Sequence, residues 1–583
     1  INNVVLEGNK TLADIGIKTM TTLRAGIGKP DGTTITVDED GTMHSAGGGC
    51  AEGDFASKEI YGDKSISLGR TEDSVVGSRS VAYGDNLIAT GYEAVNFGQK
   101  NQTTDMRSVA FGFNNKSSST NSFSCGQNNQ SSGKASFTSG ASNIAISSYS
   151  SSVGCANIAL GSGSHAENCQ NIAGAKYVFK IESYDAVEKR FTFDETYTGF
   201  SGAFAALDVG SELFVQNIRY IDISSIYTVS AKGSDGKSVT VNEDIPTSNY
   251  SVFYATLVKS DENHLGCHAE GRISVALNSY AHAEGCMTEA TGSCSHTQGL
   301  KTKATGDNSH ASGQNTLASG LDSFAEGHKT IASGSRSHAM GYRTEALYDQ
   351  LAIGHYNDTG LAVGGGYSGT GTGTALVIGN GSESAKSNAV RIDYNGKLWC
   401  KQSYSSTGAD YAELFEWADG NHNNEDRRGY FVTLDGKKIR KANNGDYIVG
   451  IISGNPSVIG NADMEWYGQF MRDEFGTFIK ESYKETVKEP CIDEGENDTE
   501  IEHEVDVEFY KVNPDYDPDA PYTFRLDRPE WDAVGMLGVL PVRDDGTCKV
   551  GRYCRCADGG IATLAEERGF DTYMVIERVT DDI

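Results

Sequence analysis

Small and large side chains alternate with period two over two long stretches of the chain. In each stretch a glycine follows the alternating segment and recurs every 14 residues. The first series is Gly84, Gly98, Gly112, Gly126, Gly140 and Gly154, and the second is Gly271, Gly285, Gly299, Gly313, Gly327 and Gly341. Period-two alternation is typical of a β-strand with two unlike faces. The pattern predicts a solenoid of short strands with one coil per repeat.

The two faces of each predicted strand differ in size. Ser80 and Ala82 stand four and two places before Gly84, whereas Val81 and Tyr83 stand three and one places before it. A face of small residues suits the narrow inside of a flattened coil. The larger apolar face is then left outside, where a thin solenoid buries it most simply against other copies of the chain.

In the second series the larger face carries a column of histidines. The column contains His268, His282, His296, His310 and His338, with Phe324 interrupting it and Glu270, Glu284 and Glu326 beside it. Equivalent residues of a parallel solenoid stack about 4.8 Å apart, so these residues are expected to form ladders. A ladder at a three-fold axis either binds an anion or a metal or responds to mild acid, or it is a hydrogen-bonded His–Glu network that only holds subunits together. The second interpretation is favoured, and neither a metal site nor a cofactor is assigned.

Three of the repeat segments point to a known family. Ser80-Val-Ala-Tyr-Gly84, Ser108-Val-Ala-Phe-Gly112 and Ser337-His-Ala-Met-Gly341 resemble the head repeat of YadA-like trimeric adhesins. That resemblance implies a left-handed parallel β-roll in which three chains lie side by side. The expected fold class is therefore mainly β, and the expected assembly is a homotrimer.

The composition divides the chain into six predicted parts. An N-terminal attachment segment is expected at 1–48, with a short helix in Leu12–Ile27 and a strand in Thr33–Val37. The remaining parts are β-roll repeats at 49–175, an inserted small β domain at 176–260, further β-roll repeats at 261–356, a Gly- and Ser-rich neck with strands at 357–405, and a C-terminal mixed, β-rich domain at 406–583.

The start of the C-terminal domain carries the sharpest motif. Ser405-Ser-Thr-Gly-Ala-Asp-Tyr-Ala-Glu-Leu-Phe-Glu-Trp417 closely resembles the autoproteolytic intramolecular chaperone domain of the pre-neck appendage peptidase family, the G2 type. The resemblance implies a domain that trimerises, guides folding of the upstream fibre and then cuts itself off at its N-terminal edge. Carried over by motif, the cleaved bond is Ser405–Ser406, and Asp410 and Glu413 are the essential acids, with Ser405 standing where the family is associated with asparagine.

The residue types at this motif suit peptide cleavage. The Ser406 hydroxyl can attack the preceding carbonyl and form an ester that water opens more easily than an amide. Alternatively, water attacks directly. Either route needs one acid to take a proton and another to supply one, roles that Asp410 and Glu413 can divide. Two other interpretations stay open: the acids only cap strands or pair with Arg427 and Arg428, or Lys401 forms a dyad with Ser403 or Ser405, which the surrounding motif fits poorly.

Charge and cysteine pattern restrict the partners. The formal net charge is -30, which repels nucleic-acid phosphates and anionic lipid, so neither nucleic acid nor membrane is expected as a partner. Cys554 and Cys556 form a C-x-C pattern without histidines at zinc spacing. No stretch has the apolar length of a membrane-spanning helix.

The sequence therefore predicts a structural phage tail fibre or neck appendage with one self-directed cut and no multiple-turnover activity. It is expected to be made in the host cytoplasm and to reside on the virion. The expected partners are other virion proteins through the N-terminus and a host receptor or glycan. Two alternatives are a bacterial trimeric surface adhesin without enzymatic activity and a glycan-degrading tail spike, which needs paired carboxylates in a cleft.

Overall fold

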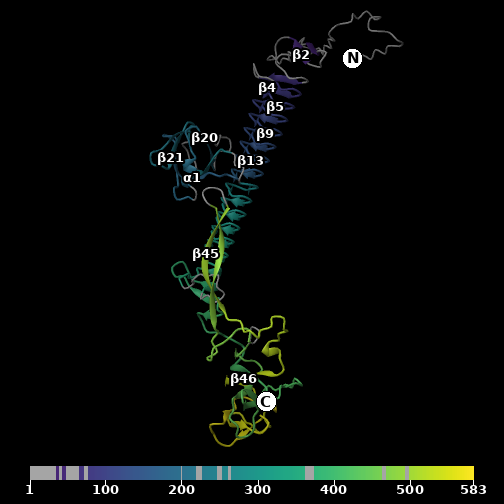
Figure 1. The fold of residues 1–583 in the computed structure, drawn as a ribbon, viewed down its shortest axis with the longest axis vertical. Coiled ribbons are helices and arrows are strands. Elements are labelled where there is room, and N and C mark those ends of the chain that lie inside the picture. The colour runs from purple at the N-terminus through teal and green to yellow at the C-terminus, as the bar shows by residue number, and fades with distance from the viewer. Residues whose placement is uncertain are drawn as a thin grey trace, which may run out of the picture. The chain divides into compact units, whose positions relative to one another are not determined.

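The computed structural model describes residues 34–37, 43–46, 65–70, 76–197, 200–217, 226–245, 252–259, 264–360, 373–462, 468–492 and 498–583. The chain divides into two compact units (Figure 1), of which unit 1 comprises Ile1–Gly366 and Thr372–Leu398, and unit 2 comprises Tyr367–Gly371 and Trp399–Ile583. The helix expected in Leu12–Ile27 lies outside the described residues. Strand β1 (Thr34–Val37) pairs in antiparallel fashion with β2 (Met43–Ala46).

Unit 1 is dominated by a parallel solenoid, drawn as the stacked coils between the labels β4 and β13 and beyond (Figure 1). A typical coil contains a five-residue strand, such as β7 (Val109–Phe113), and a two-residue strand, such as β8 (Lys116–Ser117). Strand β7 pairs in parallel with the equivalent strand of the next coil, with Gly112 opposite Gly126. The 14-residue glycine period is thus one coil of the solenoid, as the alternation predicted.

The longer strands of the solenoid and the strands that follow them are β3 (Ile66–Arg70), β4 (Val81–Ala89), β5 (Val95–Gln99), β7, β9 (Phe123–Gln127), β11 (Phe137–Ala141), β13 (Ser151–Cys155), β15 (His165–Cys169), β25 (His282–Cys286), β27 (His296–Leu300), β29 (His310–Gln314), β31 (Phe324–His328), β33 (His338–Tyr342), β35 (Leu351–His355), β36 (Thr374–Asn380), β37 (Asn388–Asp393) and β38 (Leu398–Cys400). The two-residue strands are β6 (Gln102–Thr103), β8, β10 (Gln130–Ser131), β12 (Ile144–Ala145), β14 (Ile158–Ala159), β16 (Ile172–Ala173), β23 (His268–Ala269), β24 (Val275–Ala276), β26 (Glu289–Ala290), β28 (Lys303–Ala304), β30 (Leu317–Ala318), β32 (Ile331–Ala332) and β34 (Glu345–Ala346).

Small side chains fill the inside of the coils. Ser80 and Ala82 are fully buried, whereas Tyr83 on the other face is 57% exposed. In the later coils of the second series the buried alanines stack into one continuous cluster, which contains Ala304, Ala311, Ala318, Ala325, Ala332, Ala339, Ala346 and Ala352. The predicted difference between the two strand faces is confirmed.

A column of buried asparagines in the first series was not anticipated from the sequence. Asn115 donates through Nδ2 to the carbonyls of Phe111 (2.8 Å) and Gly126 (2.7 Å). Its backbone N–H donates to Oδ1 of Asn101 in the preceding coil at 2.8 Å. Each such amide satisfies turn groups that would otherwise be buried without partners.

Steric contact between coils explains the repeat glycines. Gly112 has a φ of +108°, and a Cβ on it would stand 2.1 Å from the carbonyl oxygen of Gly126. A side chain at this position therefore meets backbone that cannot move aside, in addition to an unfavourable backbone conformation.

The insertion between the two series forms a closed β-barrel with strand order β17-β18-β21-β20-β19-β22. Its elements are β17 (Val178–Asp185), β18 (Arg190–Phe193), α1 (Phe200–Ala205), β19 (Glu212–Asn217), β20 (Ile226–Lys232), β21 (Ser238–Val241) and β22 (Val252–Leu257). Phe179, Phe191 and Tyr227 are buried in its core.

The barrel packs on the solenoid through a separate apolar cluster. Ile158 and Ile172 of the solenoid contact Phe214 and Tyr254 of the barrel in this cluster. The Tyr254 hydroxyl donates a hydrogen bond to Glu289, which also pairs with Lys303. The barrel is therefore attached to the solenoid by both apolar packing and a buried carboxylate.

The described residues of unit 2 form three β-sheets. The main sheet has the order β41-β40-β42-β46-β39-β43, and the others are the hairpin β44-β45 and the sheet β48-β47-β49. The elements are β39 (Asp410–Glu416), β40 (Phe431–Asp435), β41 (Lys438–Lys441), β42 (Gly450–Ile452), β43 (Val458–Gly460), β44 (Lys480–Ile492), β45 (Asp498–Tyr510), a 3-10 turn at Arg525–Asp527, β46 (Trp531–Gly538), β47 (Tyr553–Cys556), β48 (Ala562–Ala565) and β49 (Tyr573–Met574). Among the described residues, none of the helices has the length and apolar character to cross a membrane.

Candidate active site

The predicted acid Asp410 is the first residue of β39, which lies next to the edge strand β43 in the main sheet of unit 2. Strand β39 pairs in antiparallel fashion with β46 and in parallel with β43. Asp410, Ala412 and Leu414 are buried, whereas Tyr411 is exposed and Glu413 half-buried. This alternation places Asp410 on the inward face of the strand.

The Asp410 carboxylate is enclosed and only partly satisfied. It is 4% exposed, and its Oδ1 accepts a hydrogen bond of 3.0 Å from the Ser453 hydroxyl. Its Oδ2 is buried without a hydrogen-bond partner among the described residues. Gly535 makes room for this oxygen, since a Cβ there would stand 2.6 Å from Oδ2. An enclosed carboxylate oxygen with no partner is available to take a proton from a reacting group.

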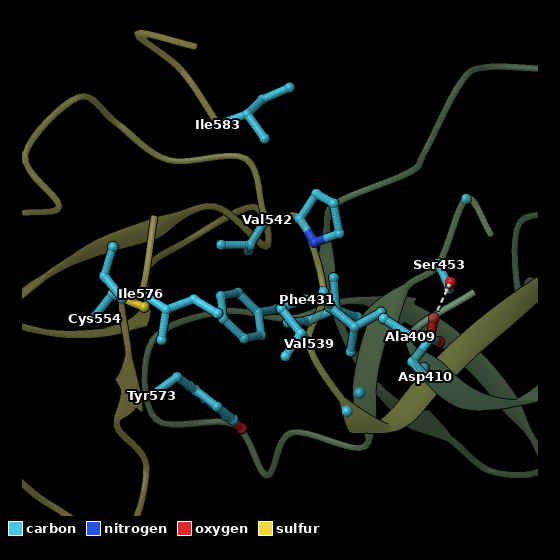
Figure 2. Close-up of a pocket in the computed structure, with 18 of the residues that line it drawn as sticks. Ala409, Asp410, Phe431, Ser453, Val539, Val542, Cys554, Tyr573, Ile576 and Ile583 are labelled. Carbon is cyan, nitrogen blue, oxygen red and sulfur yellow. Dashed lines mark hydrogen bonds between the residues drawn. The ribbon is translucent and has the colours of Figure 1, made fainter. Parts of the chain in front are cut away.

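Asp410 borders a cavity of about 1180 Å³ that also touches Thr407, Arg428 and Ser453. Figure 2 shows Asp410 and Ser453 joined by their hydrogen bond at one end, while Phe431, Val539 and Ile576 line the rest. The acid therefore faces a large space that is lined by both apolar and polar side chains.

The predicted cleavage segment leads directly into this site. Ser405 and Ser406 are exposed and lie outside regular strands. The Ser406 hydroxyl oxygen accepts a hydrogen bond of 3.2 Å from the backbone N–H of Gly408. Lys401 and Ser403, the alternative dyad residues, are exposed as well. The Ser405–Ser406 bond thus lies in an accessible segment outside regular secondary structure, just before the buried acid.

A tight turn after β42 holds the segment in place. The Ser457 hydroxyl donates to the carbonyl of Gly408 at 2.6 Å, and the Ser457 N–H donates to the carbonyl of Asp410 at 2.7 Å. A Cβ on Gly408 would stand 2.5 Å from backbone atoms of Asn455, Pro456 and Ser457. The glycine of the Gly-Ala-Asp motif is therefore required by a close backbone approach.

The structure does not bring Glu413 together with Asp410. The two residues are three positions apart on one strand, and so they lie on opposite faces. Glu413 accepts a hydrogen bond of 2.7 Å from the Tyr411 hydroxyl, and this bond raises the pKa of Tyr411. Within one chain the two acids do not form a pair around the same cavity.

Arg427 and Arg428 have other partners than the predicted acids. Arg427 pairs with Asp419 at 2.7 Å, and Arg428 pairs with Asp426 at 2.8 Å. The hydrogen bond from Arg427 lowers the pKa of Asp419 to about 2. The interpretation that Asp410 and Glu413 serve to neutralise these arginines is not supported.

A second, half-buried acid lies in the same sheet and was missed from the sequence. Asp532 on β46 accepts a hydrogen bond of 2.7 Å from Nε1 of the buried Trp417. Burial raises the pKa of Asp532. Arg427 stacks over the Trp417 ring at 4.3 Å. This network stabilises the end of β39 opposite Asp410.

The histidine column of unit 1 is placed as the spacing predicted. His268, His282 and His296 are neighbours in parallel register, and the column continues through His310, Phe324 and His338. His165 extends the column on the other side of the inserted barrel. The histidine column predicted from the sequence did not include His165, because the insertion interrupts the 14-residue period. The segment His165-Ala-Glu167 nevertheless repeats the motif His282-Ala-Glu284.

Ser453 and Gly535 were not identified from the sequence as neighbours of the Asp410 carboxylate. Both lie far along the chain from Asp410 and outside any repeat. The only local signal was the cluster of turn residues Ser453-Gly-Asn-Pro-Ser457, which marks a tight connection.

These features define a β-solenoid protein with a C-terminal β domain in which an exposed chain segment directly precedes a buried acid. Residues 357–582 match the family Peptidase_G2, described as an IMC autoproteolytic cleavage domain. The C-terminal part of the chain is therefore a domain of this family, as the motif resemblance predicted.

Similar proteins come from phages and from a bacterial genome. The chain is 37% identical over 219 residues to the pre-neck appendage protein of Bacillus phage B103, which covers 37% of this chain and 21% of that protein. It is 37% identical over 174 residues to the preneck appendage protein of Bacillus phage PZA, covering 29% of this chain and 18% of that protein. The matches thus span about a fifth of the relatives' own length. A crystal structure of the C-terminal fragment of bacteriophage phi29 gene product 12 is similar at 34% identity and a TM-score of 0.21, covering 29% of this chain and 90% of that one.

Proposed function

We propose that this protein is a trimeric structural appendage of a phage virion whose C-terminal domain directs assembly and then cuts itself off at the Ser405–Ser406 bond. One observation carries the proposal: in a domain of an autoproteolytic family, an exposed segment runs directly into a buried and half-satisfied Asp410. The rest of the structure fits the role of a fibre, since a long solenoid offers surface and rigidity.

The proposed cleavage is an acyl shift followed by hydrolysis. The Ser406 hydroxyl oxygen attacks the carbonyl carbon of Ser405, and its proton passes to Asp410. The C–N bond breaks as the Ser406 nitrogen takes up a proton, which leaves an ester between the two residues. Water then opens the ester and regenerates the hydroxyl. Because Glu413 lies on the other face of β39, its role in this scheme is to fix the strand through Tyr411.

Trimer formation is supported by an exposed aromatic stripe on the solenoid. Tyr83, Phe97 and Phe111 stack on successive coils, with ring centroids 6.1 and 5.4 Å apart. The series continues through Phe123 to Phe137. Tyr83, Phe111 and Phe137 are exposed in the single chain. A contiguous apolar surface of this kind is typical of a contact between protein subunits.

The chaperone role follows from how such a fibre folds. A parallel solenoid that joins three chains depends on non-local contacts and folds slowly. A terminal domain that associates first sets the register and raises the local concentration of the three chains. Its removal then makes the assembly hard to reverse, because the template is gone.

The virion location is supported by the relatives, whose names describe them as pre-neck appendage proteins of phages. We extend this location to the present chain, with synthesis in the host cytoplasm and attachment to other virion proteins through the N-terminal segment. A surface appendage is suited to contact a host receptor or glycan, and the inserted barrel is the candidate surface for that contact.

Self-cleavage is tested by expressing the full chain and measuring fragment masses under denaturing conditions. We expect two fragments of roughly 43 and 19 kDa, scaled by residue count from the 62.3 kDa of the intact chain. Ser406→Ala and Asp410→Asn are expected to stay intact, whereas Ser403→Ala, an exposed serine in the same segment, is expected to be cut. A wild-type chain that stays intact and is nevertheless trimeric would contradict the proposed self-cleavage but agree with the proposed fibre.

A further inference from the structure

Imidazole and carboxylate groups meet on the outer face of the solenoid where the two repeat series join. His165, His268, His282 and His296 stand in parallel register, with ring centroids 5.1, 4.7 and 4.8 Å apart. Glu167 and Glu284 follow His165 and His282 by two residues and therefore lie on the same strand face as these histidines.

The side chains form two groups of three ligand atoms. One group is His165, Glu167 and His268, and the other is His282, Glu284 and His296; in each, the atoms lie within 4.8 Å of one another. A triangle with sides of 4.8 Å has its centre about 2.8 Å from each corner, and metal–nitrogen and metal–oxygen bonds are about 2.0–2.2 Å long. Small rotations of the three side chains would bring their ligand atoms to bonding distance from an ion at this centre.

Three of the four histidines in these groups have an Nε2 without a partner, whereas Nε2 of His165 stands 3.2 Å from the Glu167 carboxylate. The Nε2 atoms of His268, His282 and His296 are buried and make no hydrogen bond within the part of the chain that the structure describes. His268 Nε2 stands 3.9 Å from the Glu270 carboxylate, beyond hydrogen-bond distance. The hydrogen-bonded network favoured from the sequence would occupy these atoms. Since a buried nitrogen without a partner is costly, a bound ligand is the better explanation.

Imidazole coordinates metals in its neutral form, and the neighbouring groups favour a cation over an anion. The carboxylates beside the histidines supply negative charge.

We propose that this column binds two divalent transition-metal ions per chain, one held by His282, Glu284 and His296 and the other by His165, Glu167 and His268. Two imidazoles and one carboxylate suit Zn²⁺ and similar ions, with a further position left for water. Mg²⁺ and Ca²⁺ prefer oxygen ligands throughout and are not expected to bind here.

The site at His165 has a structural consequence. His165 precedes the inserted barrel and His268 follows it, and yet they are neighbours in the solenoid. A metal ion shared by them fastens the coil that the chain leaves to the coil where it returns. Such a clip offsets the entropy of closing a long loop.

The test uses the full chain without an affinity tag. The protein is stripped with a chelator, dialysed against dilute Zn²⁺ and analysed for bound metal by mass spectrometry. We expect two ions per chain for the wild type, one each for Glu284→Gln and Glu167→Gln, and none for the double variant. The thermal unfolding midpoint is expected to rise with Zn²⁺ in the wild type and to stay unchanged in the double variant, and excess Mg²⁺ should not displace the ions.

His338→Asn is the matched control. His338 lies in the same column and its Nε2 is also buried without a described partner, but Met340 stands where the carboxylate would be. This variant should therefore keep both ions. The proposal is overturned if the wild type retains no metal after dialysis, or if the double variant retains as much as the wild type. Loss of metal in only one of the Glu→Gln variants would support that site and overturn the other.

Discussion

The Ser453 hydroxyl donates a hydrogen bond of 3.0 Å to Oδ1 of Asp410, and it thereby fixes a carboxylate that borders the cavity of unit 2. The other oxygen of Asp410 stays buried without a partner among the described residues. A carboxylate held by one oxygen has a defined orientation, so its free oxygen is presented in one direction. Ser453 is thus a positioning residue for the proposed cleavage.

Replacing Ser453 by alanine removes this hydrogen bond. We expect Ser453→Ala to slow self-cleavage about tenfold, because a lost hydrogen bond to a charged group costs roughly 1.5–3 kcal/mol, part of which appears in the barrier. The rate is followed by the appearance of the smaller fragment over time. Ser453→Thr, which keeps the hydroxyl, should restore the rate. An unchanged rate in the alanine variant would show that Asp410 needs no such support.

A repeat glycine in the solenoid should not tolerate a side chain. Gly313 has a φ of +104°, and a Cβ on it would stand 2.1 Å from the carbonyl oxygen of Gly327. We expect Gly313→Ala to destabilise the solenoid by more than about 4 kcal/mol, since backbone strain and a backbone clash act together. Ser312→Ala, at the neighbouring half-buried position, serves as the control. Denaturant unfolding of both variants measures the difference, and equal midpoints would contradict the steric account.

The aromatic stripe should govern assembly. Phe111→Glu places a charge in the middle of the stacked series between Phe97 and Phe123. If other copies of the chain cover this surface, burying the charge is costly and the assembly weakens. Light scattering after size-exclusion chromatography should then show a smaller species. Tyr149→Glu changes an exposed aromatic residue on a turn and should leave the mass unchanged; equal effects of the two substitutions would argue against the stripe as an interface.

Asp532 should make the stability of unit 2 depend on pH. Burial raises its pKa above the ordinary value of 3.8, so the folded state favours the protonated form. The stabilisation is complete below the ordinary value and is lost as pH rises through the raised value. We expect the thermal midpoint of Asp532→Asn to fall less than that of the wild type as pH rises above about 4. Parallel curves for the two proteins would mean that Asp532 contributes nothing to the pH dependence.

Interactions within one coil and between neighbouring coils made the solenoid predictable from the sequence. Alternation with period two, a glycine every 14 residues and a small inner face follow from steric limits that act within one coil and between neighbouring coils. The histidine column followed from the same period, and the cleavage motif was a continuous run of residues. The inserted barrel was visible only as several short strands, because the order in which they close is set by contacts between distant segments.

The sequence by itself determined the repeat architecture, the identity of the C-terminal motif and the residues of the histidine series. Only the tertiary structure decided that Asp410 is buried beside Ser453 and Gly535, and that His165 joins a column on the far side of the insertion. The physical reason is that repeats and strand faces are fixed by neighbours along the chain, whereas these contacts join residues whose separation in sequence follows no period.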